Sequence, residues 1–159
     1  MKTFLYSVFI LLLAPCNSGK KATTTASDNS KLEIVYQRTA CFGKCPIYTL
    51  TINGSTKTAT FKGEQNTDKI GTFSKSMTDD ELTQLVNAFE SANFNSLNDD
   101  YLGTITDFPM VLITYSNKGK TKRIRDRSDA PAELHTLEKI LNEFSDTTEG
   151  WKKSDTADH

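Results

Sequence analysis

Apolar residues at every second position predict β-strands near the start of the folded part of the chain. Residues 32–37 and 47–53 both show this alternation. A period of two is typical of a strand that is buried on one face. The Asn53-Gly54 pair after the second stretch favours a tight hairpin turn. Two less regular stretches are also expected to be strands, at residues 56–62 and 71–76.

Apolar residues at intervals of three and four predict two amphipathic helices. Thr78 and Glu81 have the spacing of a capping box at the start of the first helix. The apolar stripe of this helix consists of Leu82, Leu85, Val86, Phe89 and Ala92. Pro131 suits the first turn of the second helix. The stripe of the second helix consists of Leu134, Leu137, Leu141 and Phe144.

A second hairpin is predicted between the two helices. Residues 108–116 are apolar enough for a central strand, residues 117–119 suit a turn, and residues 120–127 return as the partner strand. The order of strands, helix, hairpin and helix predicts an α+β fold, with a single antiparallel sheet and two amphipathic helices packed on one face. Pairing about this turn, at positions that sum to about 236, places Asp107 within reach of Arg127.

The first 30 residues predict export and a membrane anchor. Residues 1–15 have the charge and apolar run of a secretory signal peptide, and the run is too short to span a bilayer. The segment that ends at Cys16 resembles a bacterial lipobox, in which the cysteine is lipidated, although Pro15 replaces the usual small residue. Residues 16–30 lack large apolar side chains and predict a flexible tether.

These features divide the chain into four parts. We expect a signal peptide at 1–15, a tether at 16–30, an α+β domain at 31–146 and a polar carboxyl-terminal tail at 147–159. The expected location is the bacterial cell envelope, where the exported protein is lipid-anchored to a membrane. The outer membrane is favoured.

Cys41 and Cys45 form an even pair once Cys16 is assigned to lipid. An exported chain favours a structural disulfide between them. The competing hypothesis is a thiol-based redox or copper site, because Cys-x-x-x-Cys-Pro resembles the motif of copper chaperones that assist cytochrome oxidase assembly. Those proteins place the motif before a helix, whereas here it leads into a predicted strand. His135 has Glu138 and Lys139 as helix neighbours, which predicts a solvated face, and we assign no metal ligands.

Three motifs resemble those of a family of bacterial domains of unknown function that is common among cell-envelope lipoproteins. They are Cys-Phe-Gly-x-Cys-Pro-x-Tyr at 41–48, Thr-Asp-Phe-Pro at 106–109, and Ala-Pro-x-x-Leu at 130–134 followed by Leu137 and Glu138. The resemblance spans residues 32–145. It implies a fold but no activity.

Charge is segregated along the chain, although the net charge is only -1. Residues 76–117 contain no Lys or Arg, whereas residues 118–127 contain six. Alternation places Arg123, Arg125 and Arg127 on one face of the predicted strand. This pattern fits an edge strand that is protected by charge. The alternative is a binding site for an anionic surface or an envelope protein, in which Asp107 and the three arginines take part.

These observations favour a non-catalytic, lipid-anchored envelope domain that binds a partner. The chain shows no phosphate-binding loop and has few histidines for acid–base catalysis, so we expect no enzyme activity and no cofactor. Nucleic acid is not an expected partner, because stacking aromatic residues do not interleave the basic ones. The alternative function is redox or copper handling through Cys41 and Cys45.

Overall fold

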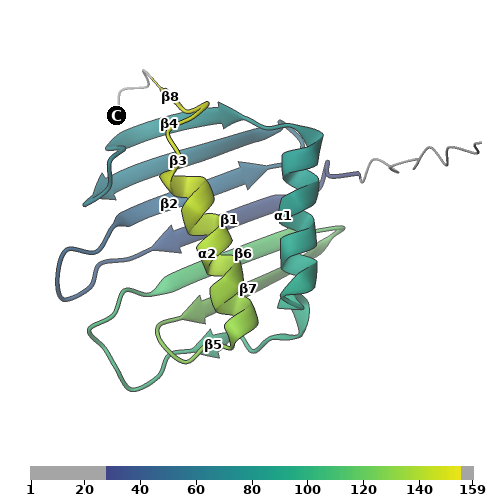
Figure 1. Cartoon of the computed structure of the whole chain (residues 1–159). Coiled ribbons are helices and arrows are strands. Elements are labelled where there is room, and N and C mark those ends of the chain that lie inside the picture. The colour runs from purple at the N-terminus through teal and green to yellow at the C-terminus, as the bar shows by residue number, and fades with distance from the viewer. Residues whose placement is uncertain (1–27, 155–159) are drawn as a thin grey trace, which may run out of the picture.

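The computed structural model describes residues 28–154, and these form one open sheet covered by two helices (Figure 1). The strands are β1 (Glu33–Arg38), β2 (Ile47–Asn53), β3 (Thr58–Gln65), β4 (Gly71–Ser76), β5 (Asp100–Tyr101), β6 (Val111–Asn117), β7 (Lys120–Asp126) and β8 (Lys152–Lys153). Their order across the sheet is β5-β7-β6-β1-β2-β3-β4-β8. The predicted strands are therefore present, and they lie in a single sheet.

The prediction of a purely antiparallel sheet is wrong, because β5 pairs with β7 in parallel. The amide of Arg125 donates to the carbonyl of Asp99 at 2.8 Å, and the amide of Arg127 donates to the carbonyl of Tyr101 at 2.9 Å. These bonds cover part of the free edge of β7. A strand of two residues has no alternation to detect, so nothing in the sequence pattern predicts it.

Helices α1 (Asp79–Ser91) and α2 (Ala132–Asp146) lie over the same face of the sheet (Figure 1). The predicted capping box is confirmed: Thr78 Oγ1 accepts from the Glu81 amide, and the Glu81 carboxylate accepts from the Thr78 amide. The covered face of the sheet supplies every second residue of its strands to the core, and the helices supply their apolar stripes. The strand residues in this core include Ile34, Tyr36, Leu50, Ile52, Phe61, Ile113, Tyr115 and Ile124.

The hairpin of β6 and β7 turns through two residues with positive φ, Lys118 and Gly119. Two such residues between strands form the turn that matches the natural twist of a hairpin. Val111 faces Asp126 across the pair, so the register is one residue from the expected one. Strand β6 begins only at Val111, because Pro109 cannot donate to a ladder. Asp107 therefore lies in the loop four residues before the strand rather than directly beside its first residue.

The carboxyl-terminal residues extend the sheet where the sequence predicted a polar tail. β8 pairs with β4, and the Trp151 ring lies 6.0 Å from that of Phe61 and 5.9 Å from that of Phe144. One tryptophan in a polar stretch gives no periodic signal. No helix of residues 28–154 is long and apolar enough to cross a membrane. The predicted signal peptide, Cys16 and most of the tether lie outside the described residues.

Lys69 closes the carboxyl end of α2. Its ammonium donates to the carbonyls of Ser145 at 2.6 Å and Thr147 at 2.9 Å, and it lies 4.8 Å from the centre of the Phe61 ring. The last carbonyls of a helix have no partner within the helix. Lys69 supplies that partner from the β3–β4 connection, and its side chain is buried.

Candidate functional site

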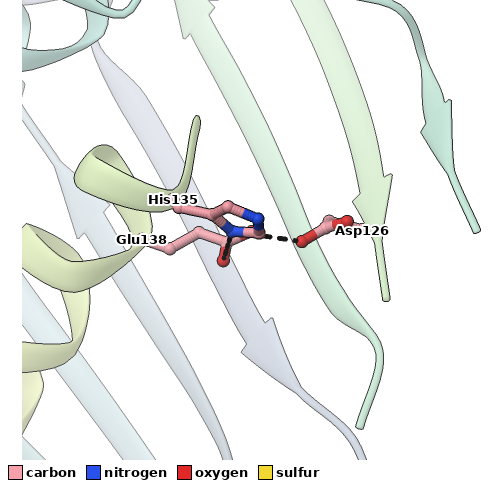
Figure 2. Close-up of side chains that lie close together, drawn as sticks. All are labelled: Asp126, His135 and Glu138. Carbon is pink, nitrogen blue, oxygen red and sulfur yellow. Dashed lines mark ion pairs between the residues drawn. The ribbon is translucent and has the colours of Figure 1, made fainter. Parts of the chain in front are cut away.

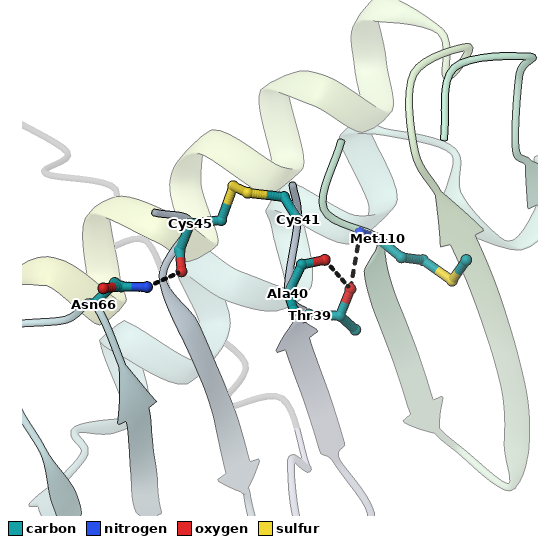
Figure 3. The surroundings of a disulfide bond; sticks show 6 residues. All are labelled: Thr39, Ala40, Cys41, Cys45, Asn66 and Met110. Atoms are coloured by element: carbon teal, nitrogen blue, oxygen red, sulfur yellow. Dashed lines mark hydrogen bonds between the residues drawn. A yellow bond between two sulfur atoms is a disulfide. The ribbon is translucent and has the colours of Figure 1, made fainter. Parts of the chain in front are cut away.

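Cys41 and Cys45 form a disulfide, as the sequence predicted. The bond closes a loop between β1 and β2 that is held on both sides (Figure 3). Thr39 and Met110 exchange two hydrogen bonds, of 3.0 and 2.9 Å, and Asn66 Nδ2 donates to the Cys45 carbonyl at 3.1 Å. The disulfide loop is thus hydrogen-bonded to the two neighbouring loops at one end of the sheet.

Exposed apolar side chains gather on these loops. Phe42 lies inside the disulfide ring and is 92% exposed, and its amide donates to the Asp107 carbonyl at 3.1 Å. The other large exposed apolar residues at this end are Ile70, Ile105 and Phe108. The loops that carry them lie at the same end of the sheet, and large exposed apolar surface on a monomer often marks a binding site. We call the surface of these four residues the disulfide end.

The predicted binding residues do not form one site. Arg123 and Arg125 lie on the face opposite the helices and line a shallow hollow of about 430 Å³ with Asp99 and Asp100. Arg125 binds Asp100 through two hydrogen bonds, of 2.6 and 2.9 Å, which lower the pKa of that carboxyl. The nearby acids therefore compete with any anionic ligand for the cations of β7.

Asp107 and Arg127 are not brought together as the hairpin register predicted. The Asp107 carboxylate is exposed, and no cation of the described chain pairs with it. Its carbonyl instead supports Phe42. Arg127 is half-buried beside β5. The loop at 102–110 turns toward the disulfide, and this direction could not be read from strand pairing alone.

A cluster of titratable groups joins the end of β7 to the start of α2 (Figure 2). Asp126 is the last residue of β7, while His135 and Glu138 lie one turn apart on α2. His135 Nδ1 is 3.7 Å from Asp126 Oδ2 and 3.5 Å from Glu138 Oε2. Among the described residues, this is the one group of three possible metal ligands within mutual reach.

Burial dominates the electrostatics of this cluster. Burial first, and then the negative charge of Asp126, raise the pKa of Glu138 to about 7 against the opposing effect of His135. Burial also raises the pKa of Asp126. One oxygen of each carboxyl group, Asp126 Oδ1 and Glu138 Oε1, has no hydrogen-bond partner within the described part of the protein. Two acids are thus held in a poorly solvated position beside a half-exposed imidazole.

The prediction of a solvated face around His135 is wrong for Glu138, which is buried. Glu138 occupies the position four residues after Leu134 and three before Leu141, so it belongs to the apolar stripe of α2. An acidic residue within an apolar stripe is the sequence feature that could have indicated this burial. Asp126 gave a second signal, since it shares a face of its strand with the buried Ile124.

One turn further along α2, Asn142 binds three donors. Its Oδ1 accepts from Tyr36 Oη at 2.9 Å, Tyr48 Oη at 2.6 Å and Arg38 Nη1 at 2.9 Å. Burial raises the pKa of both tyrosines. The positive charge of Arg38 lowers the pKa of Glu138 from this side. Arg38 therefore connects the Asn142 group to Glu138 electrostatically.

The fold and these surfaces define a small domain with two helices over one mixed sheet. A family model described as a domain of unknown function, DUF6438, matches residues 32–145. The chain belongs to this family. The comparison with curated proteins found no match. The matched span includes both cysteines of the disulfide and the whole Asp126–His135–Glu138 cluster, and Cys16 precedes it.

Proposed function

We propose that this protein is a non-catalytic, exported domain, anchored to an envelope membrane by lipid on Cys16, which binds a partner protein through the disulfide end. The observation that carries the proposal is Phe42. Its side chain is almost wholly exposed, yet its backbone is fixed by the disulfide ring and by the Asp107 carbonyl. Aromatic side chains held in advance in their bound position lose little entropy on binding and are frequent hot spots.

The position of the disulfide end supports this role. Strand β1 enters the sheet at Glu33, which pairs with Asn53 and Ser116, and it leaves at Arg38 beside the disulfide loop. The chain that leads back to Cys16 is therefore attached at the opposite end of the sheet. A random-coil tether of this length reaches roughly 20 Å. An anchored domain can then present Phe42 away from the membrane.

The charges around the exposed apolar residues favour a protein partner. Lys44 lies within the disulfide ring, and Asp107 accepts from the Phe42 amide through its carbonyl, so the surroundings of Phe42 carry both signs. A mixed rim around aromatic anchors is typical of protein interfaces, whereas binding to anionic lipid requires an excess of cations. The cations of β7 do not supply that excess, because Asp99 pairs with Lys122 and Asp100 pairs with Arg125.

Site-specific photo-cross-linking tests the docking surface. With p-benzoylphenylalanine at position 42, irradiated cells should give one discrete adduct, which the double substitution Ile105→Ser and Phe108→Ser should reduce at least fivefold. The same probe at Ile140, an exposed apolar residue of α2, is the matched control. The partner identified from the adduct should bind the purified Phe42→Ser variant at least tenfold more weakly. Equal adducts from positions 42 and 140 would contradict the proposal.

Two further measurements test the anchor and the redox alternative. Cys16→Ser should move the protein from the membrane fraction to the soluble fraction, and the intact mass of the wild type should include acyl groups. An unacylated mature protein would exclude the anchor. Thiol titration without reductant should find Cys41 and Cys45 unreactive. Free thiols, or copper bound through them in the purified protein, would instead favour redox or copper handling.

A further inference from the structure

We propose that Asp126, His135 and Glu138 bind a single divalent cation of the zinc class at the junction of β7 and α2. This site is independent of the docking surface, because none of its three ligands belongs to the disulfide end. It is also independent of the cysteines.

The distances within the cluster fit such a site. The three possible ligand atoms all lie within 4.8 Å of one another, and His135 Nδ1 is 3.5 Å from one carboxylate oxygen and 3.7 Å from another. Zinc binds nitrogen and oxygen ligands at roughly 2.0–2.2 Å in tetrahedral geometry, which separates neighbouring ligand atoms by about 3.3–3.6 Å. Only small side-chain movements are therefore needed to bring all three atoms onto one ion.

The unsatisfied oxygens supply the second line of evidence. Asp126 is only 4% exposed, and its Oδ1 has no hydrogen-bond partner in the described chain; Glu138, at 9% exposure, leaves Oε1 in the same state. Figure 2 shows both carboxyl groups directed toward the His135 ring. Buried carboxylates are costly unless they are paired or coordinate a metal. The oxygens nearest His135 Nδ1 are Asp126 Oδ2 and Glu138 Oε2, and a cation bound there would compensate the charge of both buried carboxylates.

The donor set selects the class of cation. One imidazole and two carboxylates suit zinc and neighbouring transition metals, whereas copper(I) prefers sulfur ligands. Calcium takes six to eight oxygen ligands, and this cluster offers too few. His135 is about half exposed, so water can reach the remaining coordination position. Arg38 binds Asn142 through Nη1 and forms no ion pair with either acid in the described part of the chain.

Bound metal would link two elements that the chain joins only through residues 127–131. Asp126 ends the strand, and both other ligands lie in the first two turns of α2. The amino end of this helix has no side-chain cap, because Pro131 occupies the capping position. The metal would therefore attach the uncapped first turns of α2 to the end of β7.

Calorimetric titration of the purified protein with zinc chloride tests the site. The protein keeps its disulfide and is first freed of metal with EDTA. We expect one zinc ion per chain and a higher Tm in its presence. His135→Ala and Glu138→Gln should each weaken binding at least tenfold. Glu133→Gln, an exposed acid on the same helix, and His159→Ala should leave it unchanged.

Cobalt(II) absorption and the NMR signals of the imidazoles give a readout that does not depend on stability. Zinc should shift the His135 ring signals and leave those of His159 in place, and His135→Ala should abolish the visible bands of bound cobalt. The proposal is overturned if millimolar zinc produces neither heat nor shift. It is also overturned if all variants bind zinc as the wild type does, since the metal would then lie elsewhere.

Discussion

The two ends of α2 each bury a charge, but they treat it in opposite ways. At the carboxyl end, Lys69 is satisfied by two carbonyls and lies over the Phe61 ring. At the amino end, Asp126 and Glu138 each keep one oxygen without a partner among the described residues. A buried charge is tolerated in a stable fold when its partners are complete. The first arrangement is therefore structural, and the second is the one with capacity for a ligand.

The largest change in stability should follow from removing the Lys69 ammonium, whose partners are complete. Lys69→Met keeps much of the side-chain volume but leaves the Ser145 and Thr147 carbonyls without their donor. We expect the free energy of unfolding to fall by about 2 to 3 kcal/mol, measured by urea denaturation. Lys62→Met on the exposed side of β3 is the control and should change little. Equal losses of stability in the two variants would show that Lys69 stabilises the fold no more than an exposed lysine does.

Removing a charge from the Asp126–His135–Glu138 cluster should instead raise the free energy of unfolding. In EDTA-treated protein, Glu138→Gln removes one of two neighbouring buried carboxylates and supplies an amide that can donate to the other. We expect the free energy of unfolding to rise by about 1 to 2 kcal/mol. Glu133→Gln, at an exposed position of the same helix, should have almost no effect. A loss of stability in Glu138→Gln would mean that the carboxylate already has a complete set of partners.

Glu81 in α1 offers an acid with complete partners for comparison. Its pKa is lowered, first by the hydrogen bond from the Thr78 amide and also by Lys75 at 3.0 Å. Such a group stabilises the fold above its ordinary pKa of 4.5, and this contribution is lost as the pH falls through the lowered value. Glu81→Gln should therefore cost about 0.5 to 1 kcal/mol at pH 7 and nothing in strong acid.

The smallest effect is expected for Asp107, an exposed acid that has no charged partner among residues 28–154. Water solvates this carboxylate, so Asp107→Asn should change the free energy of unfolding by less than about 0.5 kcal/mol. Thermal denaturation of the variant beside the wild type is sufficient to measure this. A loss of more than about 1 kcal/mol would show that the Asp107 carboxylate has a structural partner, such as the Arg127 that the hairpin register suggested.

The strands and helices that follow a regular pattern were predictable from the sequence. The alternation in β1 and β2, the capping box at Thr78 and the stripe from Leu134 to Leu141 all lie where the pattern placed them. Strands β5 and β8 were not predictable, since two residues carry no period. Their positions depend on the path of the chain across the finished sheet.

The candidate sites were predictable only in part. The disulfide followed from two cysteines in an exported chain, and the structure confirms it. The cluster at Asp126 was missed, because a histidine beside a glutamate and a lysine looks like a solvated helix face. The cluster exists because Asp126 and Glu138 are buried. Their burial depends on how α2 is rotated over the sheet. That rotation is set by packing between segments far apart in the sequence.

The central place of β1 has a consequence for the order of folding. Tyr36 of β1 pairs with Leu50 on one side and with Ile113 on the other, so the first strand of the sheet is completed by a segment near the end of the domain. Contacts between distant segments form slowly, because a long loop must close before they contribute. Strands β1 to β4 can assemble as successive neighbours, but one edge of β1 stays open until β6 arrives. Until β6 has been synthesised, this open edge of β1 is available for pairing with another chain.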